Sequence, residues 1–321
     1  MKIATLTLNP ALDRTMYFDD NIKIGALNRA KTDRESVTTI GGKGTNVSCM
    51  FKILGVESTA YGFIGGDNGD TFVRGLKEYN INMDFTRTVC NSRMNIKIIT
   101  DSGIATEFNE AGGIISESEK AELLKKIEKS LCNADLFFMG GSVPVGIEKS
   151  IYRDIINLSQ NDNTRFIVDC DGEALKYCMN NEKKPFIIKP NQFELEQYCG
   201  RKFNLDLDFD NALEQIKAET LNIYNSTGVI ILCTLGEYGG LYCGKEGVFY
   251  KKSPKVEVRG FSGAGDTFLT AFCAVYFKLY EYKNNCVEAA LDFAIAAASA
   301  KVTKKGTEFP KVEEIYRIGR L

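Results

Sequence analysis

The chain has 321 residues, of which 44% are hydrophobic and 26% are charged. This composition can bury the core of one large globular domain, or of a large domain with a small appendage. The 40 basic and 42 acidic residues are well mixed and leave a formal net charge of -2, so the sequence lacks the basic character expected of a protein that binds nucleic acid or an anionic membrane.

We expect neither a secretion signal nor a membrane span, and the composition excludes several kinds of reactive site. The first residues carry neither the apolar core nor the cleavage site of a secretion signal, and the longest apolar stretch, 268–277, is too short to span a bilayer. We therefore expect a cytoplasmic protein. The absence of histidine excludes Ser-His, Cys-His and His-metal chemistry, and the ten cysteines form no C-x-x-C pair. Proton transfer must then fall to a carboxylate, a lysine, a tyrosine or a thiol.

In chain order, the apolar patterns predict alternating strands and helices. Residues 3–8 form a buried first strand, and residues 41–54 form a helix with apolar positions at spacings of three and four. Further strands are expected at 58–64, 134–139, 165–169, 186–188 and 228–233, with helices such as 117–131 and 210–224 between them. This alternation predicts a mostly parallel sheet with helices on both faces.

Two segments, 12–39 and 87–109, interrupt that alternation because polar and apolar residues alternate there without an intervening helix. Strands with one polar face, inserted near the start of an α/β chain, predict a small separate sheet. We expect this sheet to form a lid on a single domain that spans residues 1–321, since no linker, repeat or low-complexity tract divides the chain.

The most informative motif is Gly263-Ala264-Gly265-Asp266, which follows an alternating, strand-like run at 255–259 and opens an apolar run at 267–280. A strand, tight glycines and a buried helix describe an anion-binding helix N-terminus. The glycines let backbone N–H groups approach a phosphate, and Asp266 can take the proton of an attacking hydroxyl. The motif therefore suggests phosphoryl transfer, although the same residues can form a plain turn and cap.

Two widespread nucleotide motifs do not fit. A P-loop requires G-x-x-x-x-G-K-[ST], but Val37 and Gly44 stand at two of the required positions around Gly42-Lys43. A dinucleotide-binding fingerprint requires a third small residue where Phe268 stands. A nicotinamide or flavin site is therefore disfavoured.

Several motifs, in order from residue 5 to residue 306, resemble those of the ribokinase-like carbohydrate kinases of the PfkB family. Residues 41–46, Gly-Gly-Lys-Gly-Thr-Asn, are similar to the N-terminal signature of that family, and residues 263–267 to its C-terminal signature. The segments at 140–142, 189–194 and 234–236 match in order and approximate spacing. The resemblance implies a three-layer α/β/α core with a small inserted β lid, and ATP and Mg²⁺ as cofactors.

Within the family, residues 5–13 resemble the opening of 1-phosphofructokinases and tagatose-6-phosphate kinases, which favours a substrate that is already phosphorylated. Arg93, Asn95 and Lys97 are similar to the phosphate-gripping segment of that subgroup, and their spacing looks most like that of 1-phosphofructokinase. Arg93 is the first choice for the substrate phosphate because a guanidinium can offer two parallel N–H bonds, which a lysine cannot.

The resemblance also implies roles for individual residues. Asp266 is the expected general base, and the backbone N–H groups of Gly263, Ala264 and Gly265 are expected to stabilise charge on the transferring group. The expected sugar-phosphate contacts are Asp13, Gly42, Lys43, Asn46, Arg93, Arg29, Lys97 and Ser142. The expected ATP contacts are Lys189, Asn191, Thr234, Gly236, Gly263 and Gly265. Glu194, with Asn191, is expected to hold Mg²⁺ through water, although an Asn followed by a Glu three residues later equally describes a helix capping box.

We therefore expect direct in-line transfer from ATP to fructose 1-phosphate, giving fructose 1,6-bisphosphate, with the lid excluding water. A homodimer through the exposed lid edges is expected, and Arg29 acts either within its own chain or across that dimer. Three alternatives stay open: a tagatose-6-phosphate kinase, a kinase for an unphosphorylated sugar that would not need Arg93, and a non-catalytic sugar-phosphate sensor on the same fold.

Overall fold

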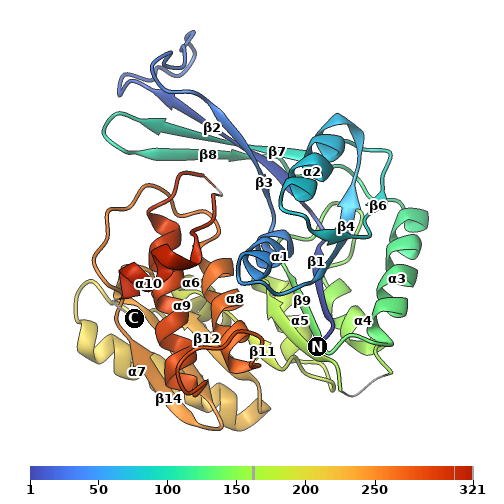
Figure 1. The fold of residues 1–321 in the computed structure, drawn as a ribbon, viewed down its shortest axis with the longest axis vertical. Helices are drawn as coiled ribbons and strands as arrows, with labels where there is room; N and C mark the ends of the chain where they lie inside the picture. The colour runs from blue at the N-terminus through green and yellow to red at the C-terminus, as the bar shows by residue number, and fades with distance from the viewer. Residues whose placement is uncertain (161–162, 307, 320–321) are drawn as a thin grey trace.

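The computed structural model describes residues 1–160, 163–306 and 308–319. Its main body is a ten-stranded sheet with helices on both faces, and a smaller four-stranded sheet extends from one side of that body (Figure 1). In spatial order the main sheet contains β14 (Gly247–Lys251), β13 (Gly240–Gly244), β12 (Ile230–Thr234), β11 (Ile187–Ile188), β10 (Arg165–Asp169), β9 (Leu136–Gly140), β1 (Ile3–Thr7), β4 (Thr59–Ile64) and β5 (Asn82–Met83), with β6 (Thr86–Arg87) also paired to β4.

The strand pairs from β12 across to β5 and β6 are parallel. The edge strands β13 and β14 instead form an antiparallel hairpin beside β12. The expectation of a mostly parallel sheet is therefore confirmed. The sequence patterns did not predict the hairpin.

The helices form two layers around the sheet. They are α1 (Lys43–Ile53), α2 (Gly66–Glu78), α3 (Glu117–Leu131), α4 (Ile151–Leu158), α5 (Gly172–Met179), α6 (Gln192–Cys199), α7 (Phe209–Thr227), α8 (Ala264–Tyr276), α9 (Val287–Val302) and α10 (Val312–Gly319), with a short 3-10 helix at Gly236–Tyr238. Alternate residues of β9 point into opposite layers: Leu136 and Phe138 pack in the core that contains α1, α8 and α9, whereas Phe137 and Met139 pack with α3, α4 and α5. This two-sided burial is the three-layer α/β/α arrangement that the sequence predicted.

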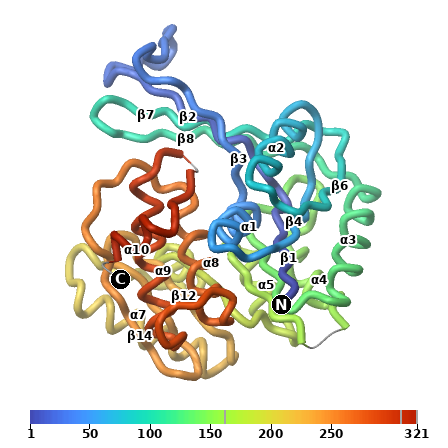
Figure 2. Tube along the Cα trace, viewed as in Figure 1, coloured from blue at the N-terminus to red at the C-terminus, as the bar shows by residue number. Residues whose placement is uncertain are grey.

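The second sheet has the strand order β3 (Val37–Gly41), β2 (Ala11–Phe18), β7 (Arg93–Thr100) and β8 (Ala105–Asn109). Its central strands β2 and β7 are parallel, and both outer pairs are antiparallel. These strands match the two segments that interrupt the strand-helix alternation, except that β2 begins one residue before the first segment and β3 ends two residues after it. The 19–36 connection lies at the outer end of the sheet (Figure 2). A small separate sheet is therefore present, and its closure as a lid stays a prediction.

One predicted strand is wrong. Residues 255–259 are irregular, and the backbone N–H groups of Arg259 and Gly260 donate to the carbonyl of Val302 at 2.7 and 3.1 Å. The segment therefore binds the end of α9 and does not join a sheet. In the described part of the chain, no helix combines the length and apolar character needed to cross a membrane.

Candidate active site

Several predicted site residues, among them Lys43, Lys189 and Asp266, lie where the parallel strands β1, β9, β10 and β11 end and where α1 and α8 begin. In an open α/β sheet, ligands bind at this carboxyl edge because loops and helix N-termini meet there. Gly263, the N-cap of α8, has φ 75°, a left-handed conformation that glycine adopts without strain. The turn thus leads the chain directly into α8.

Asp266 lies in the first turn of α8 and is 6% exposed. Its Oδ2 accepts a 2.7 Å hydrogen bond from Asn46 Nδ2 on α1. Burial, followed by the negative charge of Asp169, raises the pKa of Asp266 to about 6. A carboxyl with this pKa is ionised near neutral pH and is still basic enough to accept a proton, as a general base requires.

A buried carboxylate that the sequence analysis did not assign to the site, Asp169, lies between two lysines. Lys43 Nζ is 2.7 Å from its Oδ1, and Lys189 Nζ is 3.1 Å from its Oδ2. Burial opposes ionisation, but the charges of Lys189 and Lys43 hold the pKa of Asp169 below its ordinary value. Lys43 also lies 3.7 Å from Glu194, so one connected set of charges links α1, β10 and α6. The available signal was an aspartate at the carboxyl end of a buried strand.

Lys189 also lies beside the glycine turn. A Cβ added to Gly265 would be 3.2 Å from its Nζ, so the ammonium packs directly against the backbone of the turn. Lys189 itself is only 5% exposed. The N-terminus of α8 therefore meets a buried positive charge, which favours an anion at the same place.

On the side of the small sheet, Asp13 and Asn95 are paired across β2 and β7, and Asn95 Nδ2 donates to Asp13 Oδ1 at 2.8 Å. Burial raises the pKa of Asp13. A Cβ on Gly41 would lie 2.2 Å from Asp13 Oδ2, so glycine at this position leaves room for the carboxylate. The two side chains form a fixed polar pair.

Arg93 is half-buried beside that pair. Its Nε donates to the carbonyl of Asn9 at 3.1 Å, and one terminal nitrogen donates to the carbonyl of Glu110 at 3.2 Å. Asn9 Nδ2 donates to Ser142 Oγ at 3.2 Å, which brings the loop after β9 to the same group. No ion pair links Arg93 to a carboxylate among the described residues, so its guanidinium is positioned by carbonyl groups and keeps its charge available.

Two further predicted residues differ in their surroundings. Lys97, on β7, donates to Ser262 Oγ at 3.0 Å and pairs with Glu107 at 2.5 Å, so the small sheet touches the residue just before the glycine turn. Arg29 is exposed in the 19–36 connection and is not among the residues that these interactions bring together. Its role in substrate binding stays a prediction.

Two buried amide oxygens, Asn46 Oδ1 and Asn95 Oδ1, have no hydrogen-bond partner among the described residues. In both side chains the Nδ2 group donates to a carboxylate, of Asp266 and Asp13 respectively, which orients the oxygen away from it. An unsatisfied buried acceptor is costly, and a ligand hydroxyl would satisfy it. This arrangement suits a ligand with several hydroxyl groups.

The family model described as "pfkB family carbohydrate kinase" matches residues 6–314. The chain belongs to this family. It is 34% identical to the 1-phosphofructokinase of Borreliella burgdorferi over 98% of this chain and 96% of that protein, and 30% identical to that of Bacillus subtilis over 85% and 84%. Among solved structures, the chain is similar to phosphofructokinase-2 from Escherichia coli in complex with substrates and products. The TM-score is 0.84 at 26% sequence identity, and the alignment covers 100% of this chain and 99% of the phosphofructokinase-2 chain.

A carbohydrate kinase transfers a phosphoryl group from ATP, and the predicted nucleotide residues can be located accordingly. Thr234 ends β12 and forms a bridge to Asn191, which places the start of α6 beside that strand, and Gly236 begins the adjoining 3-10 helix. Asn191 and Glu194 form a reciprocal capping box, with bonds of 2.8 and 2.9 Å. The capping alternative raised by their spacing is therefore present in the structure.

The capping box limits how these two residues can hold a metal. Among the described residues, no cluster of three or more acidic or cysteine side chains could ligate a metal ion. Glu194 Oε2 caps the helix, and its Oε1 lies 3.7 Å from Lys43 Nζ. The donor set fits a contact through water to a cation that arrives with the nucleotide, and it does not form an all-protein metal cage.

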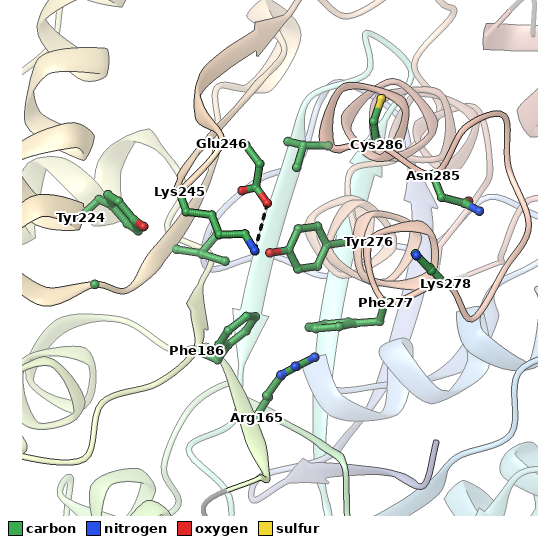
Figure 3. A pocket seen from close by; sticks show the side chains of 13 residues that line it. Arg165, Phe186, Tyr224, Lys245, Glu246, Tyr276, Phe277, Lys278, Asn285 and Cys286 are labelled. Atoms are coloured by element: carbon green, nitrogen blue, oxygen red, sulfur yellow. Dashed lines mark ion pairs between the residues drawn. The ribbon is translucent and has the colours of Figure 1, made fainter.

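A separate cavity of about 620 Å³ lies at the opposite edge of the sheet, where β10 and β11 begin (Figure 3). The Arg165 guanidinium lies over the rings of Phe186 and Phe277, 5.1 and 5.4 Å from their centroids. None of the predicted site residues lines this cavity. This cavity is therefore separate from the candidate site.

Proposed function

We propose that this kinase phosphorylates fructose 1-phosphate with ATP to give fructose 1,6-bisphosphate. The observation that carries the proposal is the buried carboxylate of Asp266, held by Asn46 in the first turn of α8 directly after the glycine turn. Family membership supplies the reaction class, and the similarity to curated 1-phosphofructokinases supports the substrate.

Substrate binding would use both sides of the site. Arg93 would bind the existing phosphate, since its guanidinium is oriented by two carbonyl groups. Asp13 would accept hydrogen bonds from sugar hydroxyls, and the unsatisfied oxygens of Asn46 and Asn95 would accept others. Lys97, Ser142 and Lys43 would be supporting contacts, and Arg29 would join them only if the 19–36 connection moves toward the site. Gly42, where a Cβ would lie 2.5 Å from Thr7, would contact the substrate through its backbone at the start of α1.

The transfer step follows from the position of Asp266. Its carboxylate accepts the proton of the sugar hydroxyl as the hydroxyl oxygen forms a bond to the γ-phosphorus of ATP. The bond from that phosphorus to the bridging oxygen of ADP breaks, and the electron pair leaves with ADP. Backbone N–H groups of Gly263 and Gly265 would donate to the transferring oxygens, and that of Ala264 would join them by giving up its 3.3 Å bond to the Phe261 carbonyl. The buried charge of Lys189 adds to that stabilisation.

Nucleotide positioning would rest on Asn191, Thr234 and Gly236, which line the turn after β12 and the start of α6. Mg²⁺, when bound with ATP, neutralises part of the phosphate charge, and Glu194 would hold the hydrated ion through water. Closure of the small sheet over the sugar would exclude water and limit ATP hydrolysis. The contact between Lys97 and Ser262 supports this arrangement of sheet and turn.

The proposal is tested by MgATP-dependent ADP release from the purified protein with fructose 1-phosphate, tagatose 6-phosphate, fructose 6-phosphate and free sugars, compared by kcat/KM. We expect a large preference for fructose 1-phosphate. Preference for a 6-phosphate would indicate that the sugar binds in the opposite orientation. Preference for a free sugar would indicate that Arg93 does not bind a substrate phosphate. Binding without turnover of any of them would replace the kinase with a sugar-phosphate sensor.

A further inference from the structure

Lys301 is a fully buried lysine that neither the sequence motifs nor the proposed transfer step uses. It lies one residue before the end of α9. At such a position a lysine ordinarily extends into solvent, and its positive charge interacts favourably with the negative end of the helix dipole. Here the residue is 0% exposed and ranks among the largest completely buried side chains of the described chain. Complete burial of an ammonium is costly unless a specific partner compensates it.

The partners of Lys301 are incomplete. Its Nζ donates to the carbonyl of Gly306 at 2.9 Å and lies 5.7 Å from the centroid of the Phe309 ring. No ion pair joins it to a carboxylate in the described parts of the chain. Lys189, the other fully buried lysine near the turn, has Asp169 as its counter-charge at 3.1 Å. The site thus holds one balanced ammonium and one without a bonded anion.

The side chain of Lys301 runs beneath the glycine turn. A Cβ added to Gly263 would lie 3.4 Å from Lys301 Cε and 3.4 Å from Asn46 Nδ2. At the other glycine of the turn, a Cβ added to Gly265 would lie 3.2 Å from Lys189 Nζ. The two lysine side chains therefore pack against the two glycines of the turn that would meet the transferring phosphoryl group.

We propose that Lys301 is a positioning residue of the phosphoryl-transfer site: its side chain packs against the 263–265 turn, and its ammonium, held by the Gly306 carbonyl, supplies the buried positive charge that the transferring phosphate balances. This inference rests on the proposed function, because the missing counter-charge is then the phosphate of the bound nucleotide. A buried charge that is already in position stabilises a transition state more strongly than a charge in water, because the protein does not have to reorganise as the transition state forms.

The electrostatic surroundings agree with that role. Burial lowers the pKa of Lys301 to about 8 against the raising effects of Asp266 on α8 and Glu308 after α9, and Lys97 on β7 and Lys304 after α9 lower it further. Lys301 then loses its proton as pH rises through about 8, so activity should fall there. Stability changes in the opposite direction, because the folded state releases this proton at a lower pH than the unfolded chain does. The contribution of Lys301 to the free energy of unfolding therefore rises with pH between about 8 and the ordinary lysine pKa of 10.5.

The test compares Lys301→Met, which keeps the length of the side chain and removes its charge, with wild type and with Lys304→Met. Lys304 is the matched control because it lies near the same helix end and pairs with Glu314 at 2.6 Å and Glu308 at 3.8 Å. We expect Lys301→Met to lower kcat on the order of 10-fold or more, with little change in the KM of the sugar phosphate and loss of the decline near pH 8. Its Tm at pH 7 should equal or exceed that of wild type, because an uncompensated buried charge is removed.

Rescue provides a second arm. Lys301→Ala leaves a space beside the Gly306 carbonyl, and added methylammonium should restore part of the lost kcat in this variant and have no effect on wild type or Lys304→Met. An unchanged kcat and pH profile in Lys301→Met would overturn the proposal. A Tm so low that the variant is partly unfolded at the assay temperature would also overturn it, because unfolding would then explain the lost activity. Absence of turnover in wild type would refute the proposed function, whereas wild-type turnover with an unaffected Lys301→Met would refute only the role of Lys301. The Tm comparison does not depend on turnover.

Discussion

At the scale of single residues, the site combines two carboxylates that are buried in different surroundings. Asp169 is held ionised by Lys43 and Lys189, whereas Asp266 has only an amide as a bonded partner and its pKa is raised to about 6. Neighbouring groups whose pKa values are pushed apart are typical of acid-base sites. We therefore assign the structural charge to Asp169 and proton transfer to Asp266.

The raised pKa of Asp266 predicts an acidic limb in the pH profile. Because only the carboxylate can accept a proton, kcat should rise with pH through about 6 and level off toward neutrality. The favourable contribution of protonated Asp266 to folding is present below its ordinary pKa of 3.8 and is lost as pH rises through about 6. Initial rates at saturating substrate from pH 5 to 8 measure this limb. A flat profile across that range would contradict the assignment of the base.

The Arg93 guanidinium predicts a selective effect on the sugar phosphate. Arg93→Met should raise the KM of fructose 1-phosphate about 10- to 100-fold through the loss of charged hydrogen bonds, and leave the KM of ATP nearly unchanged. Arg93→Lys should fall between, because a lysine keeps the charge without the paired geometry. Arg74→Met, on the exposed face of α2, is the control. Equal effects on both substrates would indicate a structural role for Arg93.

At the scale of elements, substitutions in the first turn of α6 can distinguish helix capping from metal binding. Glu194→Gln keeps a side chain that can complete the capping box, so Tm should stay close to wild type, whereas Asn191→Ala should cost about 1 kcal/mol. If Glu194 holds hydrated Mg²⁺, Glu194→Gln should also raise the Mg²⁺ concentration needed for half-maximal activity. Thermal melts and Mg²⁺ titrations test both effects. An unchanged Mg²⁺ requirement would leave Glu194 as a capping residue.

The elements also show what could be predicted from the sequence and what could not. Helix α3 begins and ends as expected because its apolar spacing is regular and Ser116 with Glu119 forms a capping box. The strand expected at 255–259 does not form, because alternation of polar and apolar residues cannot by itself supply a neighbouring strand to pair with. Backbone N–H groups at the end of this segment donate to the end of α9 instead. Lys301 was missed because a lysine near the end of an alanine-rich helix has the pattern of an ordinary solvated side chain. Its burial depends on how α8 and α9 pack.

At the scale of the whole molecule, the small sheet leaves two strand edges, β3 and β8, and carries exposed apolar residues such as Phe108 at 57%. Exposed strand edges favour association, so we predict a homodimer through this sheet. Phe108→Glu should shift the protein toward monomer, and Leu207→Glu, at an exposed apolar residue between α6 and α7, should not. Analytical ultracentrifugation over a range of concentrations measures this. A wild-type protein that stays monomeric would contradict the prediction.

The central claim is that Asp266 removes the proton of the sugar hydroxyl in a direct transfer from ATP. The most direct measurement is the turnover of fructose 1-phosphate by Asp266→Asn, together with its binding of ATP and of the sugar phosphate by calorimetry. We predict a loss of kcat of about 100-fold or more with both ligands still bound, and a Tm at pH 7 no lower than that of wild type. Wild-type turnover in Asp266→Asn would contradict the mechanism.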